Sequence, residues 1–101
     1  MTRDEIMQLE AGVFLDALVG EHVMGLPIGA WALPFYSTDI AAAWQVVEKM
    51  RASGYVDYHE RNKSKITWWL FERDNGDWNA NSEAETDALA ICRDALLATM
   101  R

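Results

Sequence analysis

The segment that decides the fold is KITWWLFER, residues 65–73, in which apolar side chains follow one another without a polar alternate. Successive side chains of a β-strand point to opposite sides of the sheet, so Trp68 and Leu70 lie on one side, and Trp69 and Phe71 on the other. A strand with one wet face alternates apolar with polar residues, and this one does not. We therefore expect both faces of its sheet to be covered.

Two further strands flank this segment. YVDYHE, residues 55–60, precedes it across the polar turn RNKS, which is typical of a hairpin. After it, Asn75-Gly76 is a strong tight-turn signal that leads to a short third strand at Trp78–Ala80. Three consecutive strands joined by short turns predict an antiparallel meander.

Two helices are expected before the strands. A capping box of Thr2 and Glu5 opens the first, whose apolar residues recur at helical spacing until Gly25 ends it. The second begins at a cap within residues 37–39, carries one apolar stripe and ends at Gly54.

The last helix is expected to open at a capping box of Ser82 and Glu85 and to run to the C-terminus. The predicted order is α-α-β-β-β-α in one domain that spans residues 1–101. The fold class is α+β, with a three-stranded antiparallel meander covered on both faces as an α/β/α sandwich. Helices on one face and a partner subunit on the other would satisfy the same pattern.

The composition is that of an acidic globular protein. Sixteen acidic and nine basic residues leave a formal charge of −7, which argues against nucleic acid and anionic membranes as partners. The N-terminal residues are charged, and no stretch approaches the roughly 20 apolar residues of a membrane span. We expect the protein in the cytoplasm of the host cell.

The sequence predicts no catalysis, cofactor or metal. It lacks the glycine-rich phosphate-binding motifs, the H-E-x-x-H motif and the G-x-S-x-G motif. His22 and His59 fall in different predicted elements and, with a single cysteine, are too few for a zinc site. That cysteine, Cys92, lies in the apolar stripe of the last helix and is expected to act as a small buried hydrophobe.

The polar residues around the first hairpin have two interpretations. Asp57, Glu60 and Lys63 are residue types of metal-dependent nucleases, but their loose spacing is better explained by a solvated turn. Arg61, Lys63 and Lys65 make a local basic point on an acidic protein. This point is either a solvated hairpin tip or an edge that binds an anion.

The connection GLPIGAWALPFYS, residues 25–37, has too much glycine and proline for a helix and is too apolar for a solvated loop. It either plugs one end of the core or binds a ligand. Its end caps the second helix, and backbone N–H groups and hydroxyls there can also face a small pocket. The candidate binding residues of this region are Trp31, Tyr36, Ser37, Thr38 and Asp39.

Three runs resemble a small phage and prophage family named for its ABA sandwich domain: LDALVGEHVMG at 15–25, PFYSTDIAAAWQVVEKM at 34–50 and AETDALAICRDALLATM at 84–100. The most specific run is YSTDIAAAW. In this family a tryptophan often follows the Met-Gly pair, where this chain has Leu26, and a proline is common at the position of Ala88. The resemblance implies an α/β/α sandwich of phage or prophage origin and no activity.

We predict a non-enzymatic phage accessory protein that acts by binding and forms a homo-oligomer. As a protein-interaction module it contacts a host or phage protein through Trp31, Trp78 and its acidic helices, because tryptophan is enriched at interfaces. The alternative is a binder of a small, nucleotide-like molecule that uses the Tyr36–Asp39 segment with Arg61 or Lys63. The two hypotheses differ in whether the aromatic residues line a concavity or an exposed patch.

Overall fold

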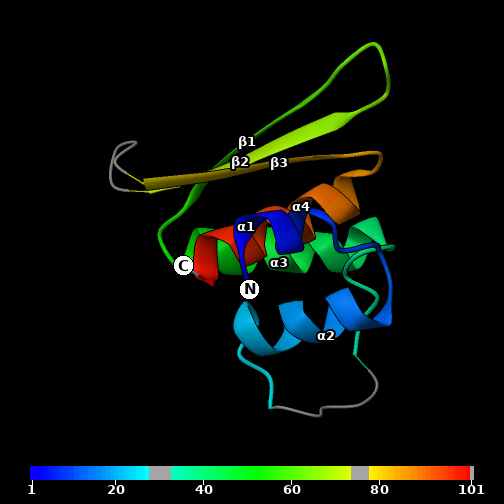
Figure 1. Ribbon diagram of the computed structural model, residues 1–101. Coiled ribbons are helices and arrows are strands. Elements are labelled where there is room, and N and C mark those ends of the chain that lie inside the picture. Colours follow the sequence, from blue (N-terminus) through cyan, green and yellow to red (C-terminus); the bar gives the residue numbers. More distant parts are fainter. Residues whose placement is uncertain (28–32, 74–77, 101) are drawn as a thin grey trace.

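The computed structural model describes residues 1–27, 33–73 and 78–100, without the side chains at positions 78 and 79. Figure 1 shows the sheet, a layer of helices under it and one further helix below that layer. The elements in chain order are α1 (Arg3–Met7), α2 (Val13–His22), α3 (Ile40–Ala52), β1 (Val56–Arg61), β2 (Thr67–Arg73), β3 (Trp78–Ala84) and α4 (Asp87–Thr99).

The sheet is the expected antiparallel meander in the order β1-β2-β3. Its register places Leu70 of β2 between Tyr58 of β1 and Asn81 of β3. In the first turn the side-chain oxygen of Asn62 accepts the backbone N–H groups of Ser64 at 2.9 Å and Ile66 at 3.1 Å. This polar network explains why the hydrophilic turn joins two strands so tightly.

The third strand is longer than predicted, and the helix after it begins later. The strand extends to Ala84, which pairs with Thr67, and Thr86 rather than Ser82 is the N-cap of α4. The prediction of a capping box at Ser82 is wrong because Ser82 belongs to β3, where it pairs with Trp69 of β2. Its hydroxyl is buried under the sheet and donates to the carbonyl oxygen of Ala90 at 2.8 Å.

The N-terminal helix also differs from the prediction. The capping box is present, with the N–H of Thr2 donating to Oε1 of Glu5 at 3.0 Å and the N–H of Glu5 donating to the Thr2 hydroxyl at 3.2 Å. The helix ends at Met7, and two residues further on the guanidinium of Arg93 donates to the carbonyl of Leu9 at 2.8 Å. Gly12 has a φ of +154°, a conformation that glycine adopts readily, so α2 starts as a separate helix.

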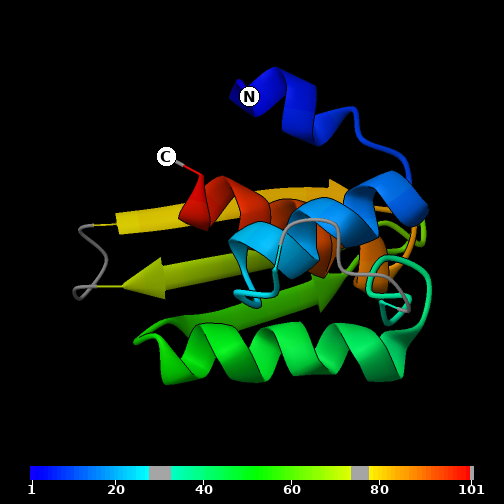
Figure 2. The same ribbon diagram turned by 90° about the horizontal axis from the view of Figure 1, so that it is seen from below.

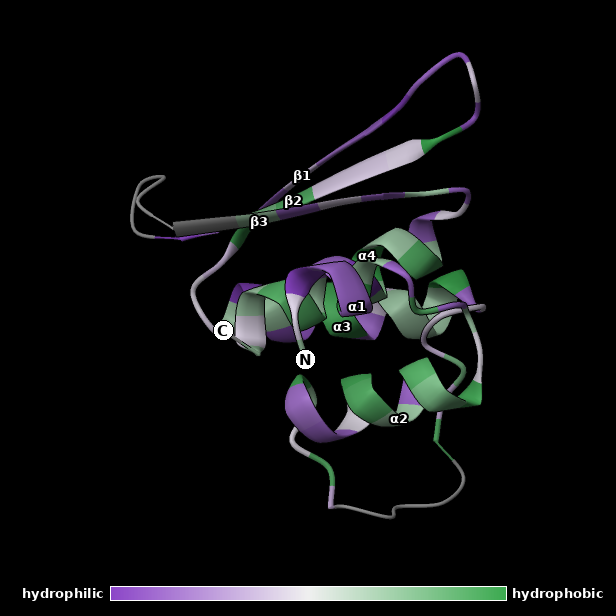
Figure 3. Cartoon of the chain, viewed as in Figure 1, coloured by the Kyte–Doolittle hydropathy of each residue, from purple (hydrophilic) through white to green (hydrophobic). Residues whose placement is uncertain are grey.

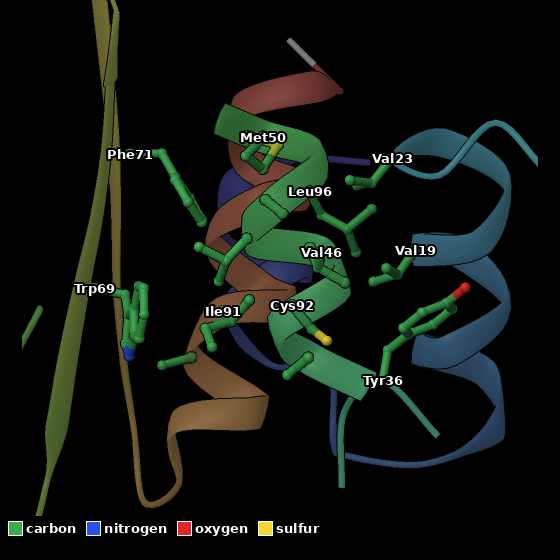
Figure 4. Packing of buried hydrophobic residues seen from close by; sticks show 14 of the residues in the cluster. Val19, Val23, Tyr36, Val46, Met50, Trp69, Phe71, Ile91, Cys92 and Leu96 are labelled. Carbon is green, nitrogen blue, oxygen red and sulfur yellow. The ribbon is translucent and has the colours of Figure 1, made fainter. Parts of the chain in front are cut away.

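The core lies between the sheet and the helices and continues between the helices themselves. In Figure 4, Trp69 and Phe71 point from the sheet toward α4, whose Cys92 and Leu96 face α2. In Figure 2, α3 runs along the β1 side of the sheet, α4 lies under β2 and β3, and α1 lies beyond β3. Helix α4 is therefore packed on two sides, against the sheet and against α2, which agrees with its many small buried residues.

All the described helices lie on one side of the sheet. The α+β class and the antiparallel sheet of the predicted sandwich are confirmed, but α2 lies behind α3 and α4 rather than on the second face of the sheet (Figure 1). Of the two arrangements considered from the sequence, the structure has the one in which the described part of the chain covers a single face. No helix in the described ranges combines the length and apolarity needed to cross a membrane.

Candidate functional site

The second face of the sheet carries a stripe of apolar side chains and is uncovered by any described helix. We call this surface the open sheet face. Val56 is 54% exposed and Tyr58 is 49% exposed, while Trp68 and Leu70 beside them are partly exposed. The residues of the open sheet face are Val56, Tyr58, Glu60, Trp68, Leu70, Glu72, Asn81 and Glu83.

Strand alternation places these side chains outward. On the inner face, Trp69 and Phe71 are 1% and 0% exposed, so their neighbours Trp68 and Leu70 must point the other way. The register then brings Tyr58 directly beside Leu70. The sequence signal for this surface was the alternation in Val56–Glu60, which places two more apolar residues on the outward side. The surface was not among the sites predicted from the sequence.

The predicted residues Tyr36 and Ser37 lie in the protein interior. Tyr36 is 2% exposed and its side chain extends to α2 in Figure 4. Burial raises the pKa of Tyr36, so its phenol is neutral over the physiological range. A ligand would have to displace core packing to reach this ring.

Ser37 belongs to a buried network that ties α2 to the segment before α3. Its hydroxyl donates to Oδ1 of Asp16 at 2.6 Å, and its backbone N–H donates to the same oxygen at 2.8 Å. The N–H of Gly12 donates to the Ser37 hydroxyl at 2.9 Å. Asp16 is 3% exposed, and a buried carboxylate needs such donors. The sequence signal was an acid within the apolar stripe of α2.

Two other predicted residues do come together. Thr38 and Arg61 line one concavity of about 360 Å³, with the N-terminal residues Thr86 and Asp87 of α4. The sequence separates these positions by more than one element, and only the fold joins them. The lining also includes Glu85, so the concavity is not a uniformly basic site.

Asp87 is an acid of this concavity whose carboxylate is held by hydrogen bonds. Its Oδ1 accepts the Thr67 hydroxyl at 2.6 Å and the Trp69 indole N–H at 2.9 Å. Burial raises the pKa of Asp87, but these bonds and the charges of His59 and Arg61 outweigh burial and lower it. Asp87 is therefore an anion at neutral pH, which opposes the binding of a second anion beside Arg61.

The remaining predicted site residues are spread over the molecule. The Asp39 side chain caps α3 by accepting the N–H of Ala41 at 3.0 Å, as one interpretation of the segment predicted. Lys63 is exposed in the first hairpin. Trp31 and the side chain of Trp78 lie outside the described residues.

Three residues considered for catalysis or metal binding, Asp57, His59 and Cys92, have structural surroundings that account for them. Asp57 accepts two bonds from the guanidinium of Arg51, from Nε at 2.6 Å and from Nη2 at 3.0 Å, which joins the end of α3 to β1. The ring of His59 stacks on Trp69 with 4.4 Å between centroids. Cys92 is buried, and burial raises the pKa of its thiol. Within the described ranges, no three His, Cys, Asp or Glu side chains lie close enough together to hold a metal ion.

One buried carboxyl group was not singled out from the sequence. Asp94 of α4 is 0% exposed, and neither of its carboxylate oxygens has a hydrogen-bond partner among the described residues. Burial raises the pKa of Asp94 to about 9, and the weaker opposing effects come from the backbone of Phe71 and the charge of Arg3. Asp94 is therefore protonated at neutral pH. The sequence signal was an acid at a helix position between apolar residues.

Comparison with known proteins supports the fold. The family model of the phage ABA sandwich domain matches residues 17–96. The crystal structure of a phage protein from Bacillus cereus ATCC 14579 is similar, with a TM-score of 0.71 over 90% of this chain and 96% of that chain. The two sequences are 24% identical, so this likeness extends to the fold alone. No curated protein matches the sequence.

Proposed function

Because the chain belongs to the phage ABA sandwich domain family, we propose that it is a phage protein that acts without catalysis, by binding another protein through the open sheet face. The observation that carries this proposal is the exposure of Val56 and Tyr58 beside Leu70 and Trp68. Contiguous apolar surface with a polar rim is a mark of interaction sites. An antiparallel sheet without such a role carries polar residues on its open face.

A small polar molecule is the second candidate ligand, and the concavity at Thr38 and Arg61 supports it. Hydroxyl groups and a guanidinium can hold a phosphate or a sugar. This candidate ranks second because Glu85 and Asp87 line the same concavity and oppose a nucleotide-like anion. Native mass spectrometry of the protein from phage-infected cells tests it, since a bound nucleotide adds a discrete mass that is lost in Arg61→Ala.

Self-association is the other part of the proposal, and α2 supports it. This helix exposes Val13 by 77% and Phe14 by 65%, so apolar residues occupy both its buried and its outer side. Figure 3 shows hydrophobic residues along much of its length. A helix that is apolar on all sides is typically buried. A second copy of α2 would bury these side chains without bringing many like charges together.

The interaction through the open sheet face is tested by comparing captured proteins. Tyr58→Thr/Leu70→Thr removes the two central apolar groups and keeps residues that favour strands. The matched control is Phe35→Thr, which removes a 64% exposed aromatic ring outside the sheet. Each tagged variant is expressed during infection, and retained proteins are quantified by mass spectrometry. A candidate partner is then purified and titrated against each variant by calorimetry.

We expect a stoichiometric partner that the wild type and the Phe35→Thr variant retain and the double variant loses. The far-ultraviolet circular dichroism of all three proteins should be the same. Equal retention by the double variant, with its fold intact, would refute the proposal that the open sheet face is the binding surface.

A further inference from the structure

The open sheet face has an apolar stripe of limited size. Val56 and Tyr58 of β1 lie next to Leu70 and Trp68 of β2, and β3 contributes polar residues on this side. The stripe extends over four residue steps of β1, from the Val56–Glu72 pair to the Glu60–Trp68 pair, a length of about 13 Å. The axes of β1 and β3 are about 10 Å apart, which is close to the diameter of one α-helix.

Acidic side chains surround this stripe. Glu60 and Glu83 flank Trp68 at one end, and Glu72 lies beside Val56 at the other end. None of the described side chains on this face is basic. A partner that covers the stripe must therefore bring positive charge to both ends, because unpaired carboxylates at an interface are costly.

A second copy of this chain does not meet that requirement. Two open sheet faces packed together would place three glutamates of each copy around the same small apolar stripe, in a chain whose net charge is already −7.

We propose that the open sheet face binds a basic amphipathic helix of a partner protein, a proposal that rests on the proposed function. The apolar stripe of that helix lies on Tyr58 and Leu70, which are paired neighbours of β1 and β2. Its lysine or arginine residues reach Glu60, Glu72 and Glu83. The bound helix then covers the second face of the sheet, which no described helix covers.

The test is a titration of the ¹⁵N-labelled protein with a synthetic helix, followed by NMR. The probe is a peptide of about 18 leucine and lysine residues, about 27 Å long as a helix, with leucine on one side. Its control has the same composition with leucine spread around the helix. We expect chemical shift changes concentrated at Tyr58, Leu70 and the Trp68 indole, and weak changes with the control peptide.

A pair of charge variants separates a specific site from general attraction. Glu60→Lys/Glu72→Lys/Glu83→Lys reverses the rim of the open sheet face. The matched variant reverses three exposed acids elsewhere, as Asp4→Lys/Glu10→Lys/Glu48→Lys. Each exchange adds two positive charges, so both variants go from −7 to −1. We expect the rim variant to weaken binding at least about tenfold and the matched variant by less than about threefold.

Equal weakening by the two variants, or equal binding of the two peptides, would overturn the inference. So would a homodimer that Tyr58→Thr/Leu70→Thr dissociates, because the occupant would then be a second copy. These failures are distinct from failure of the proposed function. That function fails only when the same double variant retains the phage or host partner as the wild type does.

Discussion

The substitution Asp94→Asn should make the protein more stable at neutral pH and remove a large part of its pH dependence. The wild-type side chain is 0% exposed and without a hydrogen-bond partner among the described residues, and burial raises its pKa to about 9. In the unfolded chain its pKa is 3.8. Asparagine has nearly the same shape and does not ionise, so it isolates the effect of the proton.

The direction and size follow from proton linkage. Below the pKa of the unfolded chain, Asp94 is protonated in both the folded and the unfolded protein. Its cost to the free energy of unfolding is therefore smallest at acidic pH. As pH rises above 3.8, the unfolded carboxyl ionises while the folded one stays protonated until about pH 9. Each rise of one pH unit between these two pKa values lowers the free energy of unfolding by about 1.4 kcal/mol. At neutral pH, about three units into the window, the accumulated loss is on the order of 4 kcal/mol.

The assay is urea unfolding of the two proteins, monitored by tryptophan fluorescence between about pH 4 and pH 8. The difference in unfolding free energy, variant minus wild type, should rise by about 1.4 kcal/mol per pH unit from a value near zero at the acidic end. Glu5 and Asp87, whose pKa values are lowered, add stability that is lost in acid. They cancel in the difference because both proteins contain them.

The control Asp4→Asn changes an exposed acid and should give a flat difference over the same range. A flat difference for Asp94→Asn would refute the reasoning. It would mean that the carboxylate is ionised in the folded protein, with Arg3 or the backbone of Phe71 supplying the compensation.

Three further predictions concern the helices. Asp39→Ala should lower the free energy of unfolding by about 1 kcal/mol through loss of the α3 cap, measured by urea unfolding, and should leave partner binding unchanged. Ser37→Ala should cost about 1–3 kcal/mol in the same assay, because Asp16 loses a buried hydrogen bond and the Gly12 N–H loses a partly buried one. A change below the error of the assay would contradict this network. In sedimentation velocity, the wild type should form a concentration-dependent assembly and Phe14→Lys should sediment as the 11.5 kDa monomer. A wild type that is monomeric at micromolar concentration would contradict self-association through α2.

Local patterns in the sequence were sufficient for most of the elements. The three-stranded meander follows from alternating and continuous apolar runs separated by turn signals, and these depend on neighbours in the chain. The start of α3 at Asp39 and the capping box of α1 also depend on residues two or three positions apart. Predictions failed where a distant residue intervened. Arg93, far along the chain, binds the carbonyl of Leu9 where the first helix was predicted to continue, and Ser82 pairs with β2 instead of capping a helix.

The candidate site was only partly predictable. The two apolar sides of β2 were evident in the sequence, and so was the need for something to cover each side. The sequence did not show which of the predicted binding residues are accessible. In the structure, Tyr36 and Ser37 are buried in the core, while Thr38 and Arg61 line one concavity.

The sequence by itself determined the α+β class, the antiparallel meander and the family of this protein, because periodicity, turns and caps act over a few residues. Only the tertiary structure decided that α2 lies behind α3 and α4 and that the open sheet face is framed by glutamates. The physical reason is that an apolar face specifies burial but not the surface that buries it. That choice depends on how helices far apart in the chain share a single core.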